Sequence, residues 1–478
     1  MGKRSVTAIT NSSGETGLTR SQQWHAVTAS FLGWTLDAFD FFVVVFLVDT
    51  LAAQFHVSKS AIVWTLTATL ATRPLGALIF GLLADRYGRR IPLMADVIFF
   101  SIIELACGFA PNYVTFLVLR ALYGIGMGGE WGVGASLAME SAPQRWRGIL
   151  SGMLQSGYSV GYLLAALVNG ILQPSPHVAD WHWRAMFWIG GVPALLALYI
   201  RTKVPESEAW KQHRAPTVRE VLKAVAGGRY PVLVISAVPM ALWAACLLQP
   251  ALVSRLIPLP WIATMALLFT LIFLFLWLSS RQLAYLGLMM TLFMFLSHGT
   301  QDLYPDFLTT VHAMSSSTVS WIAVLYNIGA VAGAIVFGRM SEHVGRRRSI
   351  VLALALSASV LVFWAFGTSV LIVALSAFLM QAGVQGAWGI IPAHLNELSP
   401  GAARGLVPGM AYQLGILFAA PTNTIEYALR DWLGYRWALA AFEIITIVLL
   451  AVVVSLGPEN KGLSFMREEF GESVAAPG

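Results

Sequence analysis

Long apolar blocks, most of them about twenty residues, dominate this 478-residue sequence. An α-helix of ~20 residues is long enough to cross the ~30 Å hydrocarbon core of a bilayer. The blocks lack the two-residue alternation of a membrane β-barrel, so helices are the expected spanning form. Charged residues make up only 11% of the chain and hydrophobic residues 57%, which is too little polar surface for a soluble protein of this length. The sequence therefore predicts an all-α protein that crosses a membrane many times.

Fourteen transmembrane helices are expected. They cover approximately 27–52, 61–83, 92–110, 112–138, 147–172, 183–202, 230–250, 258–279, 283–301, 318–340, 349–367, 369–395, 405–427 and 437–457.

The loops after even-numbered segments are basic, as in Arg86 and Arg89 after the second or Arg346 after the tenth. Loops rich in Lys and Arg stay on the cytoplasmic side. These loops and both termini are therefore predicted to be cytoplasmic, in a cell (inner) membrane. This placement of the basic residues explains the pI of about 9.4 without a nucleic-acid partner.

Residues 1–22 are polar, so no cleavable signal is expected. Cys107 and Cys246 lie in apolar segments and predict no disulfide.

The chain also repeats itself at one offset of 257 residues. Gly81 to Arg90 recurs as Gly338 to Arg347, Trp131 as Trp388, and Arg147 as Arg404. Several separate features at one offset indicate a duplication of six helices in the same orientation. Segments seven and eight have no counterpart and form an inserted pair. The expected organisation is a cytoplasmic tail (1–26), an N-terminal six-helix half (27–202), a charged linker (203–229), the inserted pair (230–279), a C-terminal half (283–457) and a cytoplasmic tail (458–478).

The loop from Gly81 to Arg90 resembles the G-x-x-x-D-R-x-G-R-R signature of the major facilitator superfamily. The resemblance implies that fold and a gating role for the loop and its repeat. The glycines permit a tight turn, and the charged side chains can pair across the interface between the halves; alternatively, they only anchor the topology. The predicted gating residues are Gly81, Asp85, Arg86, Gly88, Arg89, Gly338, Glu342, Gly345 and Arg346.

Segment nine ends in Ser297-His298-Gly-Thr300-Gln301-Asp302. This resembles the N-x-x-S/T-H-x-S/T-Q-D-x-x-x-T motif of fungal lactate and pyruvate permeases in the sialate:proton symporter family. Five specified side chains agree, whereas Met294 and Asp306 depart from the motif. The inserted helical pair is also similar to bacterial sialic acid permeases of that family. The resemblance implies a proton-coupled carboxylate transporter.

Ionisable side chains inside membrane segments are energetically costly and usually face a cavity or a partner. Asp37 and Asp40 share one helix face by their spacing of three, and each raises the proton affinity of the other. They are candidate proton carriers; the alternative is a pair of fixed anions beside an arginine. Arg73 can hold a substrate carboxylate with two parallel hydrogen bonds, unless it only pairs with one of these aspartates.

The remaining candidates fall into the same two roles. His298, Gln301, Gln413, Trp131 and Asn423 are predicted to contact substrate, with packing alone as the alternative for Trp131. Asp302, Glu130 and Arg120 are predicted to join Asp37 and Asp40 in proton coupling; the ten-residue spacing makes a direct Glu130–Arg120 pair unexpected. Glu104 and Asp96 are expected to be structural or near an edge.

The sequence thus predicts a secondary symporter of a small monocarboxylate, lactate or pyruvate, with protons. Sialic acid is the closest alternative substrate, and another organic or aromatic acid is a further one. No metal-ligand spacing or nucleotide loop is present, so neither cofactor nor enzyme activity is expected. We expect a monomer in the lipid bilayer. A membrane enzyme, a receptor or a channel are competing classes.

Overall fold

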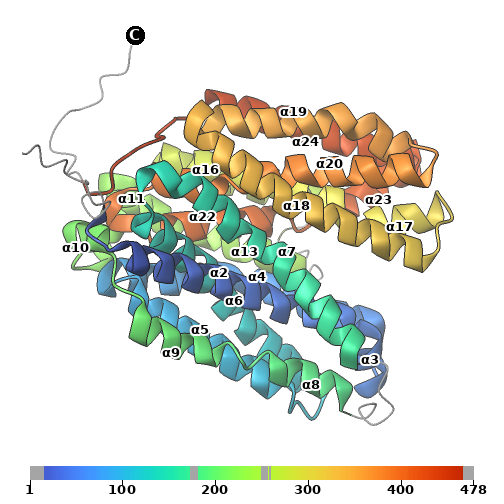
Figure 1. Cartoon of the computed structure of the whole chain (residues 1–478), viewed down its shortest axis with the longest axis horizontal. Coiled ribbons are helices and arrows are strands. Elements are labelled where there is room, and N and C mark those ends of the chain that lie inside the picture. The colour runs from blue at the N-terminus through green and yellow to red at the C-terminus, as the bar shows by residue number, and fades with distance from the viewer. Residues whose placement is uncertain (1–15, 173–180, 249–256, 258–259, 467–478) are drawn as a thin grey trace, which may run out of the picture.

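The structure is a computed structural model that describes residues 16–172, 181–248, 257 and 260–466. Every regular element in these ranges is a helix. The helices form two groups that lie one above the other, with most axes along the longest dimension of the molecule (Figure 1).

The N-terminal half forms the lower group in Figure 1. Its helices are α2 (Arg20–Phe46), α3 (Val48–Gln54), α4 (Lys59–Tyr87), α5 (Arg90–Cys107), α6 (Tyr113–Ser141), the 3₁₀ turn η1 (Gln144–Trp146), α7 (Arg147–Leu172), α8 (His182–Ile189) and α9 (Ala194–Lys203). The C-terminal half contains α16 (Arg281–Gln301), α17 (Tyr304–Thr310), α18 (Ser316–Val344), α19 (Arg346–Phe366), α20 (Val370–Trp388), α21 (Ile391–Leu398), η3 (Gly401–Ala403), α22 (Val407–Ala419), α23 (Thr422–Leu433) and α24 (Tyr435–Leu456).

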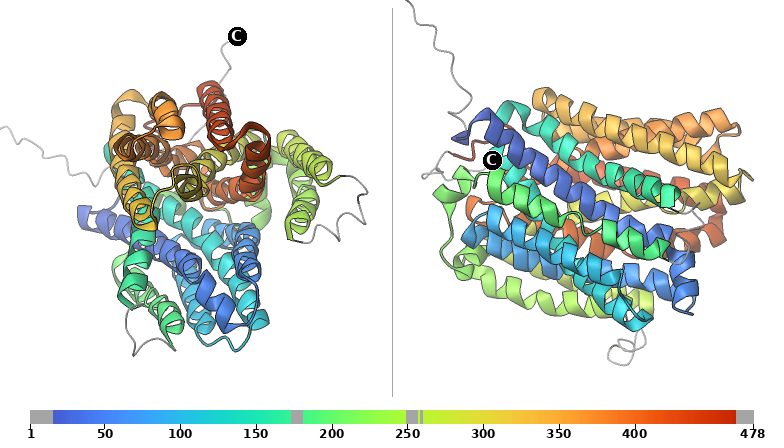
Figure 2. Two further views of the ribbon diagram at one scale, coloured as in Figure 1. Left: turned by 90° about the vertical axis from the view of Figure 1, so that its right-hand side faces the viewer. Right: turned by 60° about the horizontal axis from the view of Figure 1, so that its bottom comes forward.

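The part of the chain that connects the two halves contains α10 (Glu208–His213), α11 (Val218–Ala226), η2 (Gly227–Arg229), α12 (Tyr230–Ile235), α13 (Ala237–Leu248) and α15 (Trp261–Ser279). The last three correspond to the predicted inserted pair. They lie at one side of the bundle, as the yellow-green helices of Figure 2 show. Trp243 of α13 donates its indole N–H to the Leu417 carbonyl of α22 over 2.9 Å, which fixes the pair against the C-terminal half.

Each of the fourteen predicted segments coincides with one helix or with two consecutive helices. Helix α2 begins at Arg20, before the predicted segment 27–52, because Thr19 and Gln22 form a capping box that starts the helix inside a polar stretch. The charged linker 203–229 contains the short helices α10 and α11. Residues 1–15 and 467–478 of the predicted tails lie outside the described residues.

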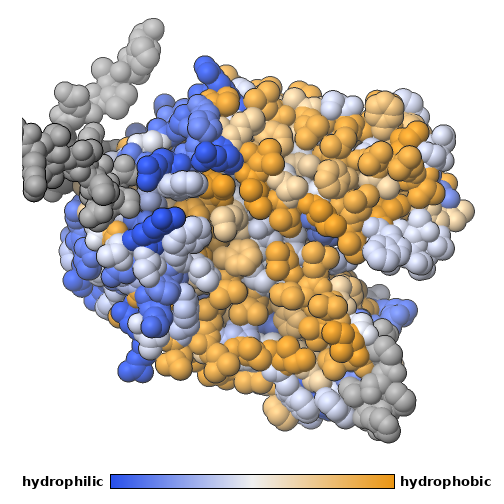
Figure 3. Space-filling model, in the orientation of Figure 1, coloured by the Kyte–Doolittle hydropathy of each residue, from blue (hydrophilic) through white to orange (hydrophobic). Residues whose placement is uncertain are grey.

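Among the described residues, eight helices are long and apolar enough to cross a membrane, and nine if the bent pair Val218–Ile235 and Ala237–Leu247 counts as one. An apolar belt covers most of the visible face in Figure 3, and the hydrophilic residues gather at one end, around α10 and α11. We call this the charged end. The chain is therefore a multi-pass membrane protein with the all-helical architecture that the sequence predicts.

The two halves meet closely toward the charged end and separate at the other. Glycines allow the contact: a Cβ on Gly132 would lie 2.7 Å from the Gly409 Cα, and one on Gly338 would lie 2.6 Å from the Gly148 carbonyl oxygen. Small residues of this kind let membrane helices approach backbone to backbone. At the opposite end, on the side of α3 and α17, the surface is hollowed between the halves (Figure 3).

Candidate functional site

The loop after α4 joins the two halves at the charged end. The Asp85 carboxylate accepts hydrogen bonds from the backbone N–H groups of Gly405 (2.7 Å) and Leu406 (3.0 Å) in the other half. Arg89 pairs with Asp85 at 2.6 Å and with Glu140 at 2.9 Å, and all three side chains are fully buried. A carboxylate with backbone donors and a guanidinium is a strong contact at low dielectric. This network links the two halves at the charged end.

The second copy of the loop repeats the arrangement. Glu342 accepts a hydrogen bond from the Gly148 N–H across the interface. Arg346 lies 3.3 Å from Glu342 and 2.9 Å from Glu397. Glu397 is also 3.2 Å from Arg147 of the opposite half. The structure thus places Asp85 and Arg89 in one buried network between the halves, and Glu342 and Arg346 in its repeat.

The glycines of the loops have separate roles. Gly88 and Gly345 end their helices at φ +102° and +106°, where other residues would be strained. A Cβ on Gly81 would lie 2.8 Å from the Leu406 Cα, so Gly81 permits close approach. Arg86 is different: its side chain is exposed over the Tyr87 ring, 4.9 Å from the ring centroid. The structure does not bring Arg86 into the buried network, because the side chain points from the helix end toward solvent.

Two glutamates that the sequence analysis missed complete the network. Glu206 accepts hydrogen bonds from the Arg89 and Arg90 backbone N–H groups (2.8 and 3.3 Å). Glu459 does the same for Arg346 and Arg347 (3.1 and 2.9 Å). Each carboxylate thereby caps the N-terminus of a helix. Burial raises the pKa of Glu206, although these donors oppose the shift. The repeated Pro-Glu pair, which follows the last helix of each half, was the sequence signal.

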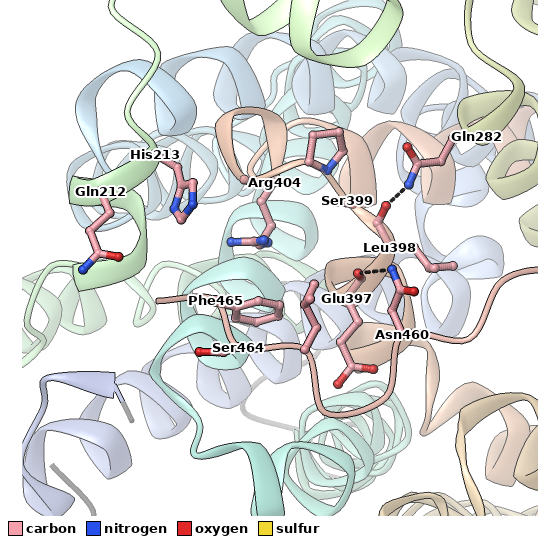
Figure 4. A pocket seen from close by; sticks show the side chains of 13 residues that line it. Gln212, His213, Gln282, Glu397, Leu398, Ser399, Arg404, Asn460, Ser464 and Phe465 are labelled. Carbon is pink, nitrogen blue, oxygen red and sulfur yellow. Dashed lines mark hydrogen bonds between the residues drawn. The ribbon is translucent and has the colours of Figure 1, made fainter. Parts of the chain in front are cut away.

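A cavity of about 510 Å³ lies at the charged end beneath this network. Phe465 lines it together with Arg404 and Glu397 (Figure 4). The Phe465 ring is buried between two guanidiniums, with Arg147 at 3.8 Å and Arg404 at 4.0 Å from its centroid. These arginines come from opposite halves and are equivalent in the duplication. Arg147 also donates to the Leu463 carbonyl oxygen at 2.9 Å. The segment after α24 therefore bridges the two halves.

Replacing Phe465 by Ala is expected to favour opening of the charged end. The change removes two cation–π contacts worth about 1–2 kcal/mol together, which corresponds to roughly 5- to 30-fold in an opening equilibrium. A cysteine at Ser136 reports opening, because Ser136 is buried and its hydroxyl donates to the Arg404 carbonyl oxygen across the interface. Both native cysteines are buried, so maleimide labelling has a low background.

Phe465→Trp, which keeps an aromatic face between the arginines, is the matched control and should label like the parent. Equal labelling of the Ala and Trp variants would show that the Phe465 ring contributes nothing to closure.

Arg73 lies deep in the interface, half-way along the molecule between the charged end and the hollow end. It is 3% exposed. Its Nε donates to Gln413 of the other half at 3.0 Å, and its Nη1 lies 3.2 Å from the Met127 sulfur. Its Nη2 has no hydrogen-bond partner among the described residues, and no ion pair to Asp37 or Asp40 forms there. The alternative of an internal Arg73–aspartate pair is therefore not what the structure contains.

Aromatic rings surround the same point. Trp131 stacks on Tyr412 with centroids 4.2 Å apart, and the Arg73 guanidinium lies 5.7 Å from the Tyr412 centroid. The Trp131 indole N–H donates to Gln155 at 3.3 Å. Trp34 and Trp388 pack edge-on against Tyr412. Trp131 is thus part of a cluster with rings from both halves, next to Arg73.

A group of buried carboxyls lies behind Arg73 in the N-terminal half. Tyr123 donates to Asp37 at 3.1 Å, while neither oxygen of Asp40 or of Glu130 has a partner among the described residues. Gly33 makes room for Glu130, since a Cβ there would lie 3.2 Å from the Glu130 carboxyl carbon. Arg120 pairs with Glu104 at 2.7 Å rather than with Glu130.

Glu104 and Asp96 also belong to this group. They were expected to be structural or near an edge; both are fully buried, Glu104 pairs with Arg120, and Asp96 has no partner among the described residues. Their membership depends on the packing of α5 against α6, which no spacing in the sequence reveals.

The segment-nine residues form a second polar patch that is more open. His298 and Asp302 are 3.1 Å apart, and their side chains are 33% and 34% exposed. Asn423 donates to Asp302 at 3.2 Å, and Gln301 donates to Gln381 at 2.8 Å. This patch is therefore more exposed than the Arg73 site, which is buried.

Ring contacts connect the two patches. Trp388 packs against Tyr412 beside Arg73 and against Phe293 of α16, the helix that carries His298, with centroids 5.6 and 5.2 Å apart. The structure therefore brings Arg73, Gln413 and Trp131 together at the interface between the halves, and His298 and Asn423 together around Asp302. Arg120 and Asp40 lie away from the interface, inside the N-terminal half.

Comparisons with known proteins agree with this architecture. Residues 21–227 match the family model "Sugar (and other) transporter" and residues 283–473 match "Major Facilitator Superfamily". The fold is similar to that of the proton:xylose symporter XylE, with a TM-score of 0.65 at 20% identity over 93% of this chain and 98% of that one.

Several curated relatives are transporters. A Saccharomyces cerevisiae "carboxylic acid transporter protein homolog" is 30% identical over 86% of this chain, which spans 62% of the relative's length. A probable 4-methylmuconolactone transporter of Cupriavidus pinatubonensis is 28% identical over 95% of this chain and 94% of its own. The sialic acid transporter NanX of Escherichia coli is 25% identical over 91% and 93%, respectively.

Proposed function

Because the chain belongs to the major facilitator superfamily of membrane transporters, we propose that it is a proton-coupled symporter of small monocarboxylates such as lactate or pyruvate. One observation carries the proposal. Arg73 is a buried guanidinium without an ion pair and with one nitrogen unpartnered among the described residues. A buried donor without a hydrogen-bond partner is costly, and a substrate carboxylate would satisfy the guanidinium with parallel hydrogen bonds.

We propose that transport proceeds by alternating access of the two halves around this point. The closed charged end and the exposure of His298 and Asp302 support an outward-facing state. In this proposal all fourteen segments cross the membrane and the two halves are 27–202 and 283–457. The charged end and both termini are cytoplasmic, and the protein acts as a monomer in the cell (inner) membrane.

Proton coupling is supported by an imbalance of charge in the N-terminal half. Five buried carboxyls, those of Asp37, Asp40, Asp96, Glu104 and Glu130, lie near two buried guanidiniums, Arg73 and Arg120. Ionising all five would leave unpaired charges at membrane depth. In this proposal some of them therefore carry protons, and Asp37 exchanges its proton when substrate occupies Arg73.

A protonophore is expected to abolish uphill accumulation of labelled lactate in proteoliposomes that hold a pH gradient. Without the pH gradient, no free energy drives accumulation of lactate against its concentration gradient. Exchange of lactate across the membrane continues, because it needs no gradient of protons. The measurement compares net accumulation with counterflow in the same preparation. Accumulation that is unaffected by the protonophore would remove proton coupling, and absence of counterflow would favour a channel or receptor.

The substrate itself is tested by competition. Sialic acid is the second candidate, favoured by the inserted helices and by the similarity to NanX; the relative described as a muconolactone transporter keeps other organic acids in the panel. Each compound is added unlabelled at equal concentration to the lactate assay. Strong competition by sialic acid with none by pyruvate would reverse the order of the two candidates.

A further inference from the structure

Two buried glutamates in the C-terminal half take no part in the proposed transport scheme. Glu443 of α24 is fully buried and Glu426 of α23 is 1% exposed. None of their four carboxyl oxygens has a hydrogen-bond partner among the described residues. In contrast, Asp85, Glu140 and Glu397 of the charged-end network each pair with an arginine. Glu426 and Glu443 therefore belong to no ion pair or hydrogen-bonded network of the described residues.

The geometry connects the pair to the hollow end. Asn423 donates to Asp302, and Glu426 follows Asn423 by three residues on the same face of α23. Helix α23, which carries Glu426, packs against α24, which carries Glu443, and both helices pack against α16. The Glu443 carboxyl lies against Gly299 of α16, so close that a Cβ on Gly299 would overlap a Glu443 carboxyl oxygen. Asp302, Glu426 and Glu443 thus form a series that leads inward from an exposed group.

We infer that Glu426 and Glu443 form a proton-binding site in the C-terminal half, loaded from the hollow end through Asp302. An ionised carboxylate without a donor is unfavourable at this depth, and two neighbouring ones are worse. A proton on the pair removes both costs. The inference rests on the proposed proton coupling and assigns part of it to residues separate from Asp37 and Asp40.

No basic side chain in the described ranges pairs with Glu426 or Glu443. Among the described residues, no group of three His, Cys, Asp or Glu side chains could hold a metal ion. The other charged groups on the packed helices are engaged elsewhere: Asp306 accepts from Tyr435, Arg430 pairs with Asp431, Arg436 donates to the Phe366 carbonyl oxygen, His298 pairs with Asp302, and the α19 arginines lie at the charged end.

The fold does not require these carboxyls. Glu443 corresponds to Gly190 under the 253-residue offset that relates Glu206 to Glu459, and Glu426 corresponds to Asn169 under the 257-residue offset; neither residue of the first half is ionisable. The same helical positions are thus occupied by uncharged side chains in the first half. A carboxyl pair in one half only indicates a function of that half rather than an element of the shared architecture.

The first test needs no substrate. Infrared spectra of the purified protein in lipid, recorded from mildly acidic to mildly alkaline pH, detect protonated carboxyls by their carbonyl stretch. Glu443→Gln and Glu426→Gln should each lose intensity from this band at neutral pH. Asp431→Asn, a change of an exposed carboxylate on α23, should not. An unchanged band in both Gln variants would show that the pair is ionised and would overturn the site.

The second test separates the site from the proposed function. Wild type, Glu443→Gln and Glu443→Asp are compared in the lactate assay, or with the competing acid that the panel identifies. We expect Glu443→Gln to keep counterflow but to lose proton-driven accumulation, and Glu443→Asp to restore it. Accumulation by Glu443→Gln equal to wild type would overturn the inference alone. Wild-type accumulation that ignores the pH gradient would instead overturn the proposed coupling.

A monovalent cation is the remaining alternative occupant. Thermal unfolding in sodium chloride is compared with unfolding in choline chloride at equal ionic strength. Stabilisation by sodium that disappears in Glu443→Gln would show that the pair binds sodium, which would also overturn the proton site. Equal midpoints in both salts are expected.

Discussion

Replacing Arg73 by Lys is expected to weaken substrate binding by about 2 kcal/mol or more, which is at least ~30-fold in affinity. Lysine keeps the positive charge but presents one ammonium instead of a planar fork, so it cannot form two parallel hydrogen bonds to a carboxylate. It also leaves the Gln413 oxygen, which now accepts from Arg73 Nε at 3.0 Å, without a correctly placed donor. Both losses act on the same point of the interface.

The measurement is counterflow at increasing concentrations of the carboxylate that the competition panel selects. Arg86→Lys is the matched control, because it is the same substitution on the same helix at an exposed position. We expect it to transport like wild type. Normal affinity in Arg73→Lys would show that no bidentate contact to Arg73 is made during transport.

The second large effect is expected for Asp85→Asn. The carboxylate accepts two backbone hydrogen bonds from the other half and pairs with Arg89, all in a buried setting. Removing one partner of a buried ion pair leaves the other uncompensated. We expect the outward-facing state to lose roughly 2–3 kcal/mol relative to the inward-facing one, about 30- to 150-fold in the equilibrium.

Maleimide labelling of a cysteine at Ser136 should therefore be much faster in Asp85→Asn than in the parent. Glu342→Gln in the second loop is the symmetry-related comparison, because Glu342 accepts one N–H from Gly148 across the interface. It should show a smaller increase in the same direction. Unchanged labelling in both variants would mean that the charged loops anchor the topology and do not hold the closed state.

Glu206 and Glu459 at the charged end are equivalent in the two halves, although their spacing differs from that of the repeated loops. The repeated loops share an offset of 257 residues, whereas Glu206 and Glu459 are 253 residues apart and do not align under it. A short insertion or deletion between repeats changes the offset without changing the role. Both residues cap the helix that follows a gating glycine, so a search for Pro-Glu after the last helix of each half would have found them.

The sequence by itself determined the helical class, the approximate segments and the duplication. These follow from local properties: the length of apolar runs, the Lys and Arg content of the loops, and identity at one offset. It also singled out Arg73, Asp37, Asp40, His298 and Asp302, because an ionisable residue in an apolar run is recognisable without knowing its neighbours.

Only the tertiary structure decided what these residues touch. Helices far apart in the sequence pack together and determine these contacts. Arg73 contacts Gln413 rather than an aspartate, and Arg120 pairs with Glu104. Arg86, in contrast, faces solvent. The same holds for Phe465 between two arginines and for Glu426 beside Glu443. Periodicity gives the face of a helix but not the partner of that face, and the partner determines whether a buried charge is paired, protonated or free for a ligand.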